Sequence, residues 1–178
     1  MLKHMYKIGA AALLVGFAGA ANAQTTVPLP DQSQTTQLRA IVSEQARINV
    51  PAAITFNVLN VANATAANAD ITIDNIVLSA ATKTVRVSVQ ANAAAFTPPA
   101  GGGNTWAASD VSWVAGSWTG GTGAAGTLSS AAFVQMANSN AGVSALTTTG
   151  LTFTLAGNAL VNRSGTHTLT MTWKVESL

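Results

Sequence analysis

The sequence predicts an all-β fold, on the basis of three observations. Apolar and polar residues alternate with a period of two through much of the chain, which is typical of half-buried strands. Clusters of Gly, Asn and Pro, the residues of tight turns, separate these segments. No segment has the apolar period of an amphipathic helix. We therefore expect a single antiparallel β-sandwich of immunoglobulin-like or jelly-roll type with about seven to nine strands.

The first 23 residues have the features of a cleavable secretory signal. Lys3 and Lys7 give a positively charged start, and residues 8–20 form a short apolar stretch. Residues 21–23 are Ala-Asn-Ala, which places small residues where a signal peptidase cleaves. We expect an exported protein, either secreted into the extracellular space or held at the cell surface.

An extended arm is expected between the signal and the folded domain. Residues 24–37 are polar, contain proline and carry no periodic pattern, which indicates an arm without secondary structure. The β-sandwich domain is then expected to cover residues 38–178. Within it, residues 38–50 are ambiguous and fit a strand better at their end than at their start.

The remaining strands are expected where the alternation is clearest. The apolar pattern of residues 71–78 is interrupted at Asp74 and Asn75, which predicts a β-bulge there. The other expected strands cover residues 54–58, 84–90, 111–114, 127–136, 151–155 and 168–175.

Composition excludes several classes of function. After removal of the signal, six basic and six acidic residues remain, so the mature chain has no net charge. It therefore lacks the basic stripe that a nucleic-acid partner requires. The absence of cysteine excludes disulfides, a thiolate nucleophile and a Cys-based zinc site. No later apolar run is long enough to span a bilayer, so an integral membrane protein is not expected after signal removal.

Residues that can carry out chemistry are few. His167 is the single histidine after the signal, and a Ser-His-Asp set with Asp110 is combinatorially possible, but no nucleophile elbow accompanies it. We expect neither an enzyme nor a bound cofactor or metal. Asp70 and Asp74 are weak candidates for calcium because they offer hard oxygen ligands, although both also suit turns.

The tryptophans suggest an alternative function. Trp113 and Trp173 lie in alternating segments, so we expect them in the core. Trp106 and Trp118 flank glycine-rich loops and are candidates for exposure. Exposed aromatic rings stack on sugars and anchor interfaces, so a carbohydrate-binding or adhesive module with a glycan partner is the alternative.

The small number of charged residues in the chain favours self-association. Natural β proteins protect their exposed strand edges with charged residues, and few are present here. An extended segment of one subunit can complete the sheet of a neighbour, and repeated head-to-tail pairing produces a filament. We expect a homo-oligomer or filament in which residues 24–50 contact the next subunit. The predicted contact residues are Leu38, Ile41, Val42, Ile48 and Val50.

A resemblance supports the same interpretation. The stretch from Ser164 to Val175, SGTHTLTMTWKV, has a small-residue turn followed by alternating Thr and apolar residues. It resembles the last strand of bacterial secreted β-sandwich surface and fibre subunits, which include pilin-like, spore-coat-U-like and WxL-type proteins. The layout of signal, arm and sandwich is also similar to that of TasA-like donor-strand filament proteins. The chain departs from chaperone-usher pilins in lacking their cysteine pair and near-terminal tyrosine. The resemblance implies an extracellular structural role.

Overall fold

The computed structural model describes residues 36–59, 62–66 and 68–178. The predicted signal, residues 1–23, and most of the predicted arm lie outside the described residues. The described strands all belong to residues 41–178, which form one compact unit. No helix in the described residues is long and apolar enough to cross a membrane.

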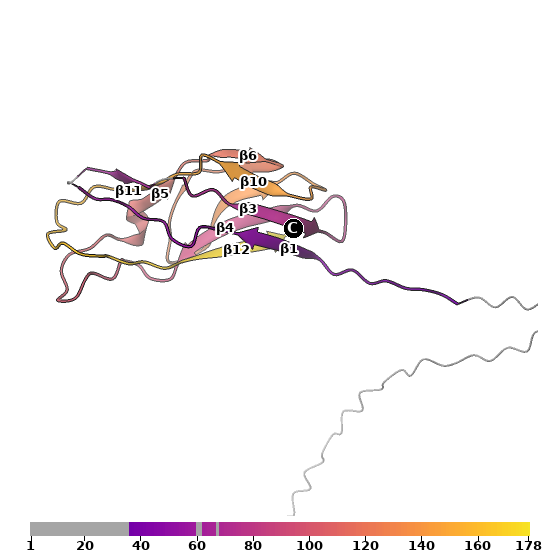
Figure 1. Cartoon of the computed structure of the whole chain (residues 1–178), viewed down its shortest axis with the longest axis horizontal. Coiled ribbons are helices and arrows are strands. Elements are labelled where there is room, and N and C mark those ends of the chain that lie inside the picture. The colour runs from indigo at the N-terminus through magenta and orange to yellow at the C-terminus, as the bar shows by residue number, and fades with distance from the viewer. Residues whose placement is uncertain (1–35, 60–61, 67) are drawn as a thin grey trace, which may run out of the picture. The chain divides into compact units, whose positions relative to one another are not determined.

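The described part of residues 41–178 contains twelve β-strands in three antiparallel sheets (Figure 1). The first sheet has the order β1 (Gln45–Asn49), β3 (Thr72–Val77), β10 (Leu146–Thr149) and β6 (Ser117–Thr119). The second has the order β2 (Ala64–Thr65), β11 (Phe153–Leu155), β5 (Val111–Trp113) and β8 (Gly126–Thr127). The third has the order β12 (Met171–Ser177), β4 (Val85–Ala91), β9 (Val134–Ser139) and β7 (Gly121–Gly123).

These sheets confirm the all-β prediction, but the strands are shorter and more numerous than expected. A single 3-10 turn, Ala108–Asp110, precedes β5 and is the one helical element of the described residues. The predicted strand at residues 127–136 is divided between β8 and β9, because the chain turns at Ser129 to Ala132. Interruptions of this kind separate the strands into three sheets of four strands each.

The core forms from the inward-facing residues of all three sheets. Along β4, Val85, Val87 and Val89 are buried at 2%, 0% and 0% exposure, as the alternation predicts. Trp113 is also buried, which confirms its expected place in the core. The other large side chains that are fully buried are Phe153, Ile71, Ile73, Met136, Leu146 and Leu151.

The predicted bulge is present in β3. Asn75 has a φ of 51°, a left-handed conformation that asparagine tolerates better than most residues. The pairing register between β1 and β3 shifts at the same place, between Gln45 and Arg47. The extra residue allows β3 to continue on both sides of the interruption.

The strand predicted at residues 54–58 does not form, although the side chains alternate as expected. Ile54 and Phe56 pack against the core, while no strand pairs with this segment in the described structure. A strand needs a hydrogen-bonding neighbour as well as an apolar face, and only the second condition is met here.

Candidate functional site

β12 is an edge strand with one unpaired side. It pairs with β4 from Met171 to Ser177 and is the outermost strand of its sheet. Thr84 and Leu178 exchange both backbone hydrogen bonds, with N···O distances of 3.2 and 2.9 Å. Because antiparallel strands alternate in this respect, the backbone groups of Met171, Trp173 and Val175 point away from β4. Within the described structure, this side of β12 has no strand partner.

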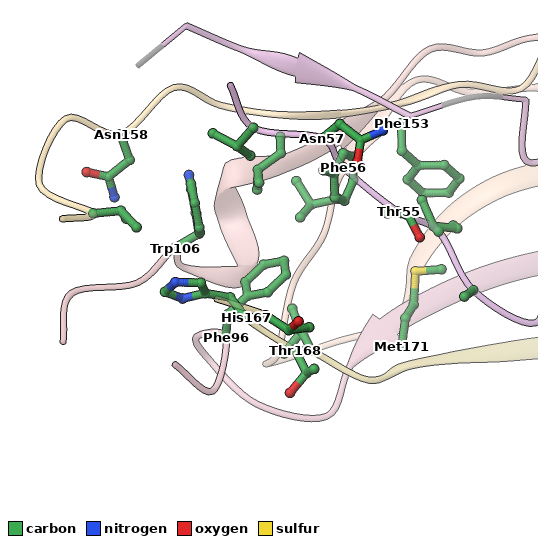
Figure 2. A pocket seen from close by; sticks show the side chains of 18 of the residues that line it. Thr55, Phe56, Asn57, Phe96, Trp106, Phe153, Asn158, His167, Thr168 and Met171 are labelled. Atoms are coloured by element: carbon green, nitrogen blue, oxygen red, sulfur yellow. The ribbon is translucent and has the colours of Figure 1, made fainter. Parts of the chain in front are cut away.

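An open groove of about 1070 Å³ with apolar and polar side chains lies at the start of β12, where Met171 and Trp173 line it. In Figure 2, Thr55 and Phe56 belong to one wall, and Thr168 and Met171 belong to the opposite wall. The groove is lined by residues 51–59 on one side and by residues 161–171 and Trp173 on the other. Its apolar lining includes Ile54, Phe56, Phe153, Leu155, Leu169, Met171 and Trp173.

The wall formed by residues 51–59 alternates like a β-strand but makes no backbone hydrogen bonds to a neighbouring strand in the described structure. Its alternating residues Ile54 and Phe56 are half-buried against the core. No backbone hydrogen bond joins residues 51–59 to the rest of the described chain. Both walls therefore present peptide groups that a further extended segment can satisfy.

An aromatic cluster closes one end of the groove. The ring of Trp106 meets His167 edge to face with a centroid distance of 5.1 Å, and Phe96 with a distance of 6.3 Å. The Trp106 indole N–H donates to the Ala156 carbonyl at 2.9 Å. Figure 2 shows these three rings together, away from Phe153 and Met171.

The two tryptophans predicted to contact a glycan are less accessible than expected. Trp106 is only 6% exposed, so the expectation of an exposed ring is wrong at this position, because the aromatic cluster covers it. Trp118 is half-buried, and its indole N–H donates to the Ala115 carbonyl at 2.6 Å. Trp173, expected in the core, is also half-buried and lines the groove.

His167 is held by hydrogen bonds on both ring nitrogens. Its Nε2 lies 3.3 Å from the Arg163 carbonyl oxygen, which can only accept, so Nε2 carries the proton. Its Nδ1 then accepts from the Thr105 hydroxyl at 2.9 Å. Asp110, the acid paired with His167 in the sequence hypothesis, instead accepts from the Ala107 N–H at 2.8 Å. These contacts give His167 a role in joining segments at the end of the groove.

The two calcium candidates bind protein groups. Asp74 receives two hydrogen bonds from Arg47, each 2.7 Å long, and this guanidinium lowers the pKa of the carboxyl. Asp70 accepts from the Leu151 N–H at 2.9 Å and from the Thr148 hydroxyl. Within the described ranges, no three His, Cys, Asp or Glu residues gather as metal ligands. Both aspartates therefore serve to link strands.

Glu44 anchors the C-terminal end of β12 at Ser177, and the sequence pattern did not predict this role. Its carboxylate accepts from the Ser79 N–H at 2.7 Å, from Lys83 Nζ at 2.7 Å and from the Ser177 hydroxyl at 2.8 Å. The Lys83 ammonium and these other donors hold the pKa of Glu44 far below its usual range. Nothing in the local sequence signals this role, because the three partners are distant along the chain.

The residues predicted to contact another subunit fall into two groups. Leu38, Ile41 and Val42 are exposed at 91%, 84% and 71%, and their segment belongs to no strand. In contrast, Ile48 lies in β1 opposite Ile73, and Val50 packs against the core. The predicted contact residues therefore do not lie in one unpaired segment, because β1 pairs inside its own sheet, and their contact with another subunit stays a prediction.

Sequence reasoning missed the acceptor side of this arrangement. The alternation of Leu169, Met171 and Trp173 predicted a strand and supported the resemblance, but it was not interpreted as a binding surface. The signal that was available is the second alternating segment at Ile54 and Phe56, which leaves two apolar faces to be covered.

Comparison of the chain with protein-family models, curated proteins and solved structures gives no match.

Proposed function

We propose that this chain is an exported structural protein, a β-sandwich subunit of a surface fibre that assembles by β-strand addition between copies. One observation carries the proposal: β12 has an unpaired edge, and a groove with apolar side chains lies at its start. An added strand would hydrogen-bond to that edge and cover the groove at the same time. Repeated addition from copy to copy gives a fibre when the contacts do not close into a ring.

The chemistry of the groove favours a peptide strand over other ligands. A lipid chain would cover the apolar lining but would leave the backbone groups of Met171 and Trp173 without partners. A glycan would hydrogen-bond to polar side chains of the lining, such as Asn57, Asn158 and Arg163, but would not form a continuous backbone ladder with the edge of β12. A strand supplies apolar side chains and backbone hydrogen bonds together.

The energetic gain is substantial for an association between subunits. Leu169, Met171 and Trp173 are half-buried in the isolated subunit. Fully burying a large exposed apolar side chain contributes about 1.5–3 kcal/mol, so covering the remaining half of each of these contributes roughly 1 kcal/mol, and several together help to offset the entropy lost on association.

A proline at Met171 tests the proposal. Its backbone N–H points to the unpaired edge, so Met171→Pro should leave the subunit folded, as checked by circular dichroism, and should abolish fibres in negative-stain microscopy. Met171→Leu keeps the N–H and a similar volume, so it is the matched control and should assemble like the wild type. Normal fibres from Met171→Pro would contradict strand addition at β12. Purely monomeric wild-type material that binds glycans would favour the adhesive alternative.

A further inference from the structure

We propose that the strand received by the groove is residues 36–43 of a second copy, with Leu38, Ala40 and Val42 facing the core. This inference rests on the proposed function and identifies the partner of the groove as the same chain. It joins two parts of the molecule that are each incomplete: an exposed apolar segment and an unfilled groove with apolar side chains.

The proposed donor has the pattern of a half-buried strand. Leu38, Ala40 and Val42 fall on one face of an extended segment, and Arg39, Ile41 and Ser43 fall on the other face. Leu38 and Val42 are 91% and 71% exposed, and no strand pairing involves this segment in the described structure. Large apolar side chains of this kind gain most when a partner covers them.

The apolar side chains of the proposed acceptor have the same two-residue spacing as those of the proposed donor. Leu169, Met171 and Trp173 are half-buried side chains of the groove, two residues apart along one extended segment. Five extended residues span about 13 Å in both segments, so the donor row and the acceptor row match in length. The middle residues, Ala40 and Met171, become neighbours whether the two strands run parallel or antiparallel.

A second copy fits this role better than the same chain. The carboxylate of Glu44 is bound to Ser177, which holds the start of β1 at the far end of β12. Ser177 and Met171 lie about 20 Å apart along an extended strand, whereas Ala40 reaches at most about 14 Å from Glu44. While the Glu44 contacts are intact, the groove is therefore filled from another subunit.

Disulfide trapping tests the pairing of the two strands. The chain contains no cysteine, so no native thiol can form a competing disulfide. Two full-length variants, Ala40→Cys and Met171→Cys, are mixed and oxidised, and the mixed dimer is measured on a non-reducing gel. We expect a strong Ala40–Met171 disulfide, because facing residues of neighbouring strands lie within disulfide distance. Arg39→Cys replaces Ala40→Cys in the matched control and should cross-link severalfold less, since its side chain faces away.

A charge substitution supplies a second readout. Val42→Asp places a carboxylate against the groove and should abolish fibres, whereas Ser43→Asp adds the same charge on the opposite face and should preserve them. Both positions precede the strands of the domain, so the fold should be unchanged in circular dichroism.

The outcomes separate this inference from the proposed function. Wild-type fibres without the Ala40–Met171 disulfide, and without an effect of Val42→Asp, would overturn the donor assignment and leave strand addition standing. A disulfide formed within one chain carrying both cysteines, in place of the intersubunit disulfide, would overturn the second copy as the source. Wild-type protein that never assembles would overturn both.

Discussion

β4 and β12 are neighbours in one sheet and carry the same alternation of apolar and polar residues, but they differ in burial. In β4, Val87 and Val89 are completely buried. In β12, Trp173 and Val175, which pair with these two valines, remain half-buried. β4 has strands on both sides, whereas β12 has one. In these two strands the period-two pattern determines which face is apolar, while the number of neighbouring strands determines how far that face is buried.

This difference separates stability from interaction. Substitutions of the β4 valines should act on the folding of the subunit, because these side chains are buried in the core. Substitutions on the outer side of β12 should act on what binds there, since its edge is unpaired in the isolated subunit.

The largest expected effect comes from truncating β4. Val87→Ala should lower the free energy of unfolding by about 2–3 kcal/mol, because it removes buried methyl groups and leaves a cavity. Val175→Ala, the paired position in β12, should cost about 1 kcal/mol or less, since that side chain is only half-buried. Urea unfolding of the unassembled subunit measures both values. Equal losses would show that β12 is enclosed as fully as β4.

Two proline substitutions distinguish the paired side of β12 from its unpaired side. Thr172→Pro removes an N–H that points to Gln90 of β4, so the subunit should lose about 1–3 kcal/mol of stability. Met171→Pro removes an N–H on the opposite side and should cost clearly less. Urea unfolding again gives the two free energies. A greater loss for Met171→Pro would mean that the outer side of β12 is already paired within the subunit.

The smallest expected effect concerns the end of β12 that Glu44 anchors. The pKa of Glu44 is lowered in the folded state, so its contribution to stability is present above the unfolded pKa and is lost as the pH falls toward the folded value. The wild type should therefore melt above Glu44→Gln at pH 7, and the difference should shrink below a pH of about 4.3.

Thermal melting between pH 7 and pH 3 measures this effect. Asp74 and Glu176 also have lowered pKa values, due to Arg47 and to Lys174 respectively, so both proteins will lose stability in acid. The informative quantity is the difference between the wild type and Glu44→Gln at each pH. A constant difference would show that the charge of Glu44 is not what stabilises this end of β12.

Much of the local structure was predictable from the sequence. The strands β4, β5 and β12 lie within or overlap the segments whose alternation predicted them, and Asn75 occupies the expected bulge. Other elements were not predictable in this way. The alternation at residues 54–58 was as clear as that of a strand, but no partner strand lies beside it in the described structure.

The all-β class and the apolar face of each strand follow from the sequence alone, because both depend on residues close together in the chain. Folding covers Trp106, pairs β1 inside its own sheet and brings Glu44 to segments distant in the chain, and no local pattern indicated these three features. Folding also decided which edge stays open. The physical reason is that strand pairing and burial depend on neighbours brought together by folding, and no local pattern specifies them.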